Sequence, residues 1–457
     1  MTKSTKLTEG NITKSIIKLA IPIMGTSFIQ MAYNMIDMIW IGRVSSDAVA
    51  AIGTAGFFTW FGMSLILIPK TGAEIGVAQS TGSDNHNATK LFIKNTIQID
   101  IILAILYGLF IFIFRNQLIG FFKLGNDAVN KMAIDYLLII IIGFPFYFIS
   151  PVLTGIFNGS GDSKTPFRIN TLGLVINIIL DPILILGFGP IPALGVKGAA
   201  IATILAQFFV SLCFFITIKS QLILFFNIHI FEKLDIDYIK KIFKLGFPSS
   251  IQNGAFAFFA MLIARLIADW GTLPIAVQKV GSQIEAISWM SASGFATAVC
   301  AFIGQNYGGK KWDRIRKGYF ISLGLVSIIG IGATFILIVF SKPIFSIFIP
   351  EKEAISYGVV YLKILGISQL FMCVEIISAG AFNGLGKTLP PAIIGILLTG
   401  SRIPLSLILA YKFNLGLNGI WWSISITSIF KGIILTSWFL IKLRSIPKIP
   451  IEPYTKL

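Results

Sequence analysis

Two aspartates in strongly apolar stretches are the side chains of this sequence best suited to bind a cation or a proton. Asp37 lies in the first long apolar run and Asp181 in the fifth. Asn177 precedes Asp181 by four residues, so in a helix the amide and the carboxylate share a face. Carboxylate, amide and hydroxyl oxygens suit a hard cation, and two adjacent carboxylates hold a shared proton because repulsion disfavours ionising both. The pair therefore predicts an ion-binding site.

Three further polar residues of the first half have the spacing or the type to join this pair. Asn34 stands three positions before Asp37 and shares its helix face, Thr203 supplies a hydroxyl in the sixth run, and Tyr136 supplies one in the fourth. An alternative stays open, in which each aspartate only hydrogen-bonds backbone groups that a nearby proline leaves free.

The second half carries buried charges at positions that do not repeat the aspartate pair. Glu285 lies in the eighth apolar run, Glu375 in the tenth, and Arg402, the clearest interior base, in the eleventh. These side chains either line a solute path and attract a cationic solute, or pair with one another and hold helices together. The sequence leaves both interpretations open.

The elements that must position these residues are membrane-spanning helices. Of the 457 residues, 55% are hydrophobic and only 12% are charged, whereas soluble domains have about 25% charged residues. Continuous runs of roughly 20 apolar residues predict spanning helices rather than barrel strands, and the first run is too long for a signal peptide. The twelve runs are 15–41, 48–70, 93–114, 132–157, 167–189, 195–218, 242–268, 275–303, 318–341, 354–382, 389–411 and 416–441.

The net charge of +17 follows from the distribution of basic residues around these spans. Most Lys and Arg fall on the side that holds both termini, which predicts cytoplasmic termini in a multi-pass protein of the cell membrane. No nucleic-acid partner is needed to explain the charge. The sequence has no HExxH, GxSxG or Walker motif and no CxxC pair, so we expect no enzyme activity and no cofactor beyond a coupling ion.

The two halves of the chain resemble each other. The segment Lys18 to Pro22 recurs as Lys244 to Pro248, and Phe157 to Gly161 recurs as Phe382 to Gly386. Because six spans is an even number, both halves enter the membrane in the same direction, which predicts two parallel six-helix lobes related by a pseudo-twofold axis. We expect an N-terminal lobe at 1–218, a cytoplasmic linker at 219–241 and a C-terminal lobe at 242–457, in a monomer that works by alternating access.

Four motifs make the chain similar to the multidrug and toxic compound extrusion (MATE) family over nearly its whole length. They are Tyr33 to Asp37 followed by Trp40-Ile41-Gly42, Asn158 to Pro166, Asn177 to Pro182, and Gly304 to Gly308. The resemblance is closest to the branch with archaeal and DNA-damage-inducible-like members. It implies a V-shaped pair of lobes that exports amphipathic organic cations and drugs in exchange for H⁺ or Na⁺.

The resemblance also assigns roles to residues. It implies that Asp37, Asn177, Asp181 and Thr203 form the cation or proton site, possible for Na⁺ as well as H⁺, with Tyr136 near it. Some sodium-coupled members place acids in the seventh and tenth spans, where this chain has Gln252 in the seventh and Glu375 about a turn from the expected acid. That departure favours the N-lobe site. The expected partners are the amphipathic organic cation substrates and membrane lipid.

One alternative function shares the same architecture, namely a flippase for lipid-linked saccharides. It would need a cationic cavity to receive phosphate, and Arg402 is the interior base on which that interpretation depends. A non-transporting receptor or scaffold would not explain buried acids next to amides.

Overall fold

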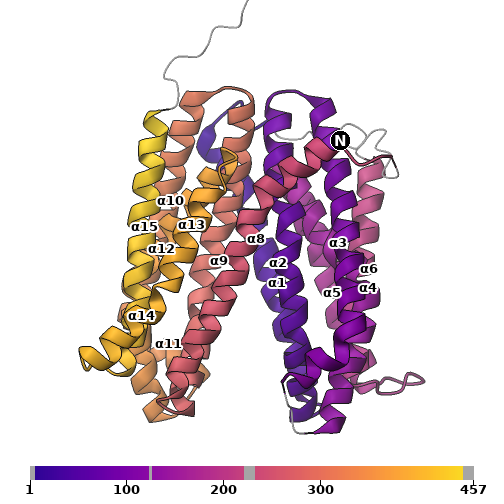
Figure 1. The fold of residues 1–457 in the computed structure, drawn as a ribbon, viewed down its shortest axis with the longest axis vertical. Coiled ribbons are helices and arrows are strands. Elements are labelled where there is room, and N and C mark those ends of the chain that lie inside the picture. The colour runs from indigo at the N-terminus through magenta and orange to yellow at the C-terminus, as the bar shows by residue number, and fades with distance from the viewer. Residues whose placement is uncertain (1–5, 123–125, 221–231, 446–457) are drawn as a thin grey trace, which may run out of the picture. The chain divides into compact units, whose positions relative to one another are not determined.

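The structure is a computed structural model that describes residues 6–122, 126–220 and 232–445. All the long secondary-structure elements of these residues are helices (Figure 1). Twelve helical segments of these residues are long and apolar enough to span a membrane, which confirms the predicted all-helical, polytopic fold class. Eleven are single helices: α1 (Ile12–Gly42), α2 (Ser46–Gly82), α3 (His86–Gly120), α4 (Asp127–Gly159), α5 (Lys164–Leu186), α6 (Val196–Ser220), α8 (Ile236–Ala268), α9 (Thr272–Gly308), α10 (Trp312–Val339), α12 (Lys352–Gly384) and α15 (Leu417–Arg444).

The remaining span is interrupted where the sequence predicts one continuous run. It consists of α13 (Leu389–Gly400), α14 (Arg402–Leu407) and a π-helical turn, η1 (Ile408–Lys412). A short helix, α11 (Ser341–Phe348), precedes α12 and was not expected from hydropathy because its eight residues are too few to cross a bilayer. The interruption places Arg402 at the first position of a new helix.

Polar side chains fix where several helices begin. The Ser45 hydroxyl accepts a hydrogen bond from the Ala48 amide, the Asn85 side chain accepts one from Ala88, and the Asn126 side chain accepts one from Ala128. Each cap satisfies an amide that has no partner inside its own helix. Helices α2, α3 and α4 therefore start at positions that the sequence marks clearly.

The described chain divides into two compact units, which we call unit 1 (the described residues of 25–250) and unit 2 (residues 6–24 and 251–445). The first half of α1 belongs to unit 2 and its second half to unit 1. The first half of α8 belongs to unit 1 and its second half to unit 2. The lobe boundaries expected at residues 218 and 242 stay a prediction about the repeat.

Helix α8 begins at Ile236, six residues before the apolar run that predicted it. The added turn carries Asp237, Lys240 and Lys241, which lower the hydropathy of this stretch but are compatible with a helix that extends beyond the lipid. The preceding residues 221–231 of the expected linker lie outside the described residues.

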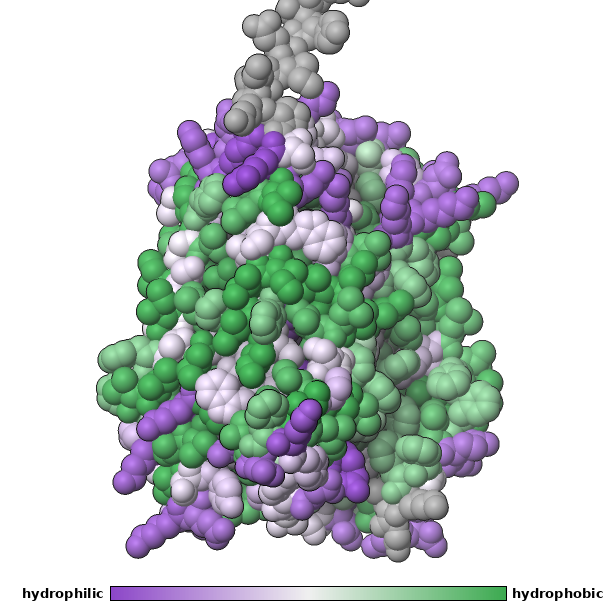
Figure 2. Space-filling model, turned by 60° about the vertical axis from the view of Figure 1, so that its left-hand side comes forward, coloured by the Kyte–Doolittle hydropathy of each residue, from purple (hydrophilic) through white to green (hydrophobic). Residues whose placement is uncertain are grey.

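Small residues allow close helix contacts inside each unit. A Cβ atom at Gly155 of α4 would lie 3.0 Å from the Lys70 carbonyl oxygen of α2, and one at Gly330 of α10 would lie 2.8 Å from the Leu370 Cα of α12. Close backbone approach of this kind is typical of helix packing in membranes, where lipid supplies no hydrophobic drive between helices. Figure 2 shows hydrophobic side chains across the middle of the visible face, with hydrophilic ones gathered toward its two ends.

Candidate functional site

A buried polar cluster in unit 1 brings together four of the residues singled out in the first half of the sequence, namely Asp37, Asn177, Asp181 and Thr203. Asn177 and Asp181 lie one turn apart on α5, and neither is exposed to solvent. The Asn177 amide nitrogen donates to the Asp181 Oδ1 atom at 3.0 Å. This hydrogen bond orients the carboxylate and fixes the amide so that its own oxygen points elsewhere.

Asp37 of α1 completes the cluster from a second helix. Its electrostatic neighbours are Asp181, Asn177 and the Thr203 hydroxyl of α6. Four buried oxygens of these residues have no hydrogen-bond partner among the described residues, namely Asp37 Oδ1, Asn177 Oδ1, Asp181 Oδ2 and Thr203 Oγ1. Leaving a buried acceptor unsatisfied costs about 1–3 kcal/mol, so a set of four on three helices has the donor chemistry of a cation or proton site.

Two tyrosines flank this cluster. Tyr136 of α4 is buried and has Asp37 and Asp181 among its electrostatic neighbours. Tyr33 of α1 has the same two neighbours, and its hydroxyl has no hydrogen-bond partner in the portion of the chain that the structure describes. Tyr33 was absent from our candidate residues, although it precedes Asp37 by four positions and so shares its helix face. The backbone of Asn34 lies in α1, but its side chain is outside the described part of the structure.

Local sequence explains why the Tyr33 hydroxyl fits between α1 and α5. A Cβ atom at Gly173 of α5 would lie 2.7 Å from that hydroxyl oxygen, so only glycine leaves it room. Helix α5 then continues through Pro182, and Gly187 ends it with a φ of 85°, a conformation that favours glycine. The Asp181 carboxylate of this helix accepts its hydrogen bond from the Asn177 side chain.

The charges of the second half form a separate polar network inside unit 2. The Lys431 ammonium of α15 lies 3.1 Å from the Glu375 carboxylate of α12, and their side chains are only 9% and 11% exposed. Arg402 donates from Nε to the Thr427 hydroxyl at 3.0 Å and from Nη2 to the Ser428 hydroxyl at 3.1 Å. Both glutamates, Glu375 and Glu285, are electrostatic neighbours of Arg402.

Glu285 of α9 is held by amide and hydroxyl groups rather than by an ion pair. The Gln369 amide donates to its Oε2 atom at 3.3 Å, and the Ser288 hydroxyl donates to the Gln369 oxygen at 2.5 Å. The structure therefore brings Glu285, Glu375 and Arg402 together. The Gln252 side chain of α8 packs against Gly395 of α13. Within the described ranges, no group of three or more His, Cys, Asp or Glu is placed to hold a metal ion.

Twelve spans and polar clusters buried within them define this protein as a polytopic helical membrane transporter. The MatE family profile matches residues 22–183 and 248–408, which is most of the chain, so the protein belongs to the MatE family, a family of transporters rather than of enzymes. The two matched segments correspond to the two halves of the internal repeat.

Curated relatives and a solved structure extend over nearly the whole chain. The chain is 28% identical to "Probable multidrug resistance protein NorM" of Thermotoga maritima over 438 residues, which cover 94% of this chain and 92% of the relative. It is 28% identical to "Probable multidrug resistance protein YoeA" of Bacillus subtilis over 425 residues, 91% of each chain. A solved structure described as the outward-facing conformation of a multidrug resistance MATE family transporter shares the fold, with a TM-score of 0.90 at 22% identity over 98% of this chain and 100% of that one.

Proposed function

We propose that this protein is an ion-coupled antiporter that exports amphipathic organic cations across the cell membrane, with both termini in the cytoplasm. The observation that carries the proposal is the unit 1 cluster. Asp37, Asn177, Asp181 and Thr203 each present a buried oxygen that has no hydrogen-bond partner within the described parts of the chain. Relatives named as probable multidrug resistance proteins support drugs as the substrate class.

The coupling ion is H⁺ or Na⁺, because the cluster has the chemistry to hold either. Two carboxylates close together in a membrane segment are costly while both are ionised, and a proton on one of them removes the repulsion. A sodium ion achieves the same neutralisation and additionally uses the amide and hydroxyl oxygens as ligands. In both cases, ion binding changes the charge between α1 and α5, the two helices that carry the aspartates.

This change in charge couples the ion gradient, which is the driving force, to the exchange. An ion that binds only one of two conformations shifts the equilibrium toward it by its differential affinity. Ion entry from outside neutralises Asp37 and Asp181 and favours the conformation that releases the organic cation, and ion loss to the cytoplasm resets the cycle. Asn177 orients Asp181 throughout, and Tyr33 and Tyr136 place hydroxyl groups next to the two carboxylates.

The test is efflux of a cationic dye from proteoliposomes under a pH gradient and, separately, a sodium gradient. We expect flux under one of the two gradients and its loss in Asp181→Asn, which keeps the shape of the side chain but removes its charge. Asp135→Asn is the matched control, because Asp135 lies in the same unit and pairs with the exposed Lys197 at 3.2 Å. Full gradient-driven flux in Asp181→Asn and Asp37→Asn would refute the site.

The lipid-linked saccharide flippase is not favoured. It depends on Arg402 as a free cation for phosphate, yet two of the Arg402 donors are engaged by Thr427 and Ser428 and two glutamates lie nearby.

A further inference from the structure

Two short segments of the chain lie outside the ion site and the unit 2 network, and each makes several hydrogen bonds to neighbouring helices. One comprises residues 232–235, directly before α8, and we call it the α8 strap. The other comprises residues 7–10, shortly before α1, and we call it the α1 strap. Each precedes a helix whose first half belongs to a different unit from its second half.

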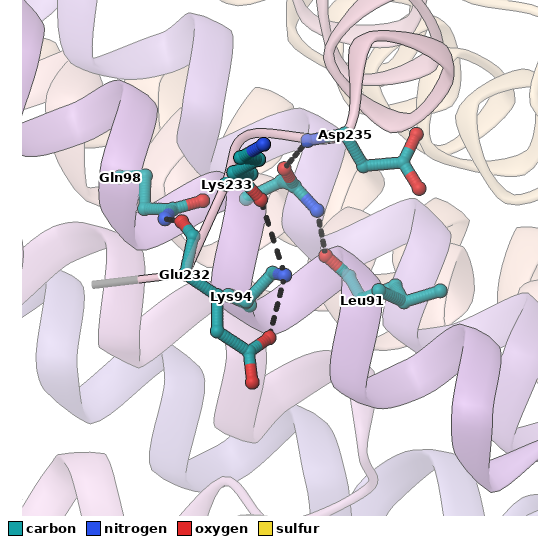
Figure 3. Close-up of polar contacts among 7 residues, drawn as sticks. Leu91, Lys94, Gln98, Glu232, Lys233 and Asp235 are labelled. Carbon is teal, nitrogen blue, oxygen red and sulfur yellow. Dashed lines mark hydrogen bonds and ion pairs between the residues drawn. The ribbon is translucent and has the colours of Figure 1, made fainter. Parts of the chain in front are cut away.

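The α8 strap is bound to one face of α3 (Figure 3). The Lys94 ammonium lies 3.1 Å from the Glu232 carboxylate, and the Gln98 amide donates to the Glu232 carbonyl at 2.7 Å. The Asn95 side chain accepts from the Asp235 amide at 2.8 Å and donates to the Leu91 carbonyl at 2.8 Å, which fixes the orientation of its amide group. All of these contacts lie within unit 1.

This arrangement accounts for three polar residues that a spanning helix would otherwise avoid. Lys94, Asn95 and Gln98 are all buried, and their spacing puts them on adjacent turns of a single helix face. A buried lysine is retained only with a partner, because an uncompensated charge there is costly. Its partner Glu232 is itself 57% exposed in its side chain, so the strap is anchored from the α3 side.

The α1 strap is bound in the same manner to unit 2, but by different residues. The Arg314 guanidinium donates to the Gly10 carbonyl at 2.8 Å and to the Leu7 and Glu9 carbonyls at 3.0 Å. The Leu7 amide donates to the Gln305 side chain at 3.1 Å, and the Leu7 side chain is 1% exposed in the core of the unit. A planar guanidinium that reaches three carbonyls orders a segment that has no helix of its own.

Both helices that follow the straps pass from one unit to the other just beyond a proline. In α1 the change falls after Met24, shortly after Pro22, and in α8 it falls after Ser250, shortly after Pro248. A proline removes one helical hydrogen bond and allows a change of direction at that point. The strapped end of each helix therefore belongs to one unit and its far end to the other, with a weakened turn between them.

We propose that the two straps stay closed throughout transport and act as fixed anchors for α1 and α8. Because the strap prevents the helix end from sliding, a displacement of a unit must bend or deform the helix itself. For α1 this transmits the displacement to Asp37 and Tyr33 at the far end. The proposal rests on the antiport function proposed above and adds the contacts that keep ion binding and movement coupled.

The test uses a cysteine-free background, with Cys213, Cys300 and Cys373 replaced by serine, that carries Lys94→Cys and Glu232→Cys. Without a bridge the strap has lost its ion pair, and with a short bis-methanethiosulfonate reagent it is closed covalently. We expect gradient-driven dye efflux to fall at least about fivefold before bridging, the lower end of typical coupling effects, and to recover after bridging. Lys197→Cys with Asp135→Cys, a more exposed ion pair of unit 1, is the matched control and should respond to neither step.

Two results would overturn the proposal. Arrest of transport on bridging would mean that the strap must open during the cycle, and normal coupled efflux before bridging would mean that no anchor is needed. Arg314→Lys at the α1 strap is a second variant, chosen because it keeps the positive charge and should therefore fold. It loses the planar guanidinium that contacts three carbonyls, so we expect the same fall in gradient-driven efflux.

The failure of the antiport function itself is distinguishable from failure of the straps. In that case the cysteine-free protein that keeps Lys94 and Glu232 shows no gradient-driven dye flux, and neither does the Lys94→Cys, Glu232→Cys variant before or after bridging. Hydrogen–deuterium exchange of residues 236–250 in the Lys94→Cys, Glu232→Cys variant then tests the anchor without transport. If the strap holds the start of α8, these amides exchange faster before bridging than after it, and equal exchange in both states contradicts the proposal.

Discussion

The ion pair between Glu375 and Lys431 gives the sharpest stability prediction. Its two side chains are 9% and 11% exposed, and 3.1 Å separates their charged atoms. Removing one partner of a buried pair leaves an uncompensated charge and typically costs about 3–5 kcal/mol. We therefore expect both Glu375→Gln and Lys431→Met to lower the free energy of unfolding by an amount in this range.

The two costs should differ, because Arg402 is an electrostatic neighbour of both partners. In Lys431→Met the remaining Glu375 still has the Arg402 guanidinium nearby, so the cost should be near the lower end, about 3 kcal/mol. In Glu375→Gln the remaining Lys431 faces a like charge, so the cost should approach about 5 kcal/mol. The double variant removes both charges and should recover most of the loss.

Equilibrium unfolding in mixed micelles, analysed as a double-mutant cycle, measures these differences directly. Ser346→Ala, on the exposed side of α11, serves as a control that should change nothing. Single variants within about 1 kcal/mol of the wild type would mean that the pair behaves as an exposed one. A milder effect of Glu375→Gln than of Lys431→Met would refute the role given to Arg402.

Three further predictions concern single residues. Thr203→Val removes one ligand oxygen of the unit 1 cluster and should weaken binding of the coupling ion by about tenfold, the value of one hydrogen bond of about 1.4 kcal/mol, measured as the ion concentration for half-maximal exchange. Gly173→Val places a side chain where the Tyr33 hydroxyl lies and should abolish coupled efflux in a protein that still inserts, whereas Gly324→Val, where a Cβ meets nothing within 4 Å, should not. The neighbouring Lys442 side chain lowers the pKa of Lys387, so Lys442→Gln should raise that pKa, as read from the NMR signals of the Lys387 ε-CH2 group; an unchanged pKa would contradict the proximity of the two ammonium groups.

Much of the fold was predictable because lipid imposes simple constraints on sequence. Runs of roughly 20 apolar residues identify spanning helices without knowledge of tertiary contacts, and all twelve spans were found. The eleventh span was found, but as one continuous run, because its hydropathy stays high across the break. Gly400 and Pro404 flank that break, whereas the π-helical turn Ile408–Lys412 contains no glycine or proline to mark it. The start of α8 was missed because charged helical residues outside lipid resemble a loop.

The site was predictable to the extent that unusual residue types stand out in an apolar background. Asp37, Asn177 and Asp181 are conspicuous in this way, and the structure places them together. Tyr33 was not, because a tyrosine in a membrane helix is unremarkable until its hydroxyl is known to lie near two carboxylates. The straps were equally hidden, since Lys94 and Arg314 had been read only as charges that set the orientation of the chain.

The shared use of α1 and α8 by both units could not be inferred from the repeat. Sequence similarity shows that residues 18–22 and 244–248 are equivalent, but not which unit each packs against. That depends on tertiary contacts such as those of Arg314 with the Leu7 and Gly10 carbonyls, which join residues about 300 positions apart.

The central claim is that Asp37 and Asp181 hold the coupling ion, and direct ion binding to the purified protein tests it without transport. Two quantities should be measured: the protons released when Na⁺ is added, and the protons taken up when the pH is lowered in the absence of Na⁺. The proteins compared are the wild type, Asp37→Asn, Asp181→Asn and the control Glu285→Gln. The account predicts that ion binding disappears in both aspartate variants and persists in the control. Unchanged binding in Asp37→Asn and Asp181→Asn, or its loss only in Glu285→Gln, would contradict the account and move the coupling site to unit 2.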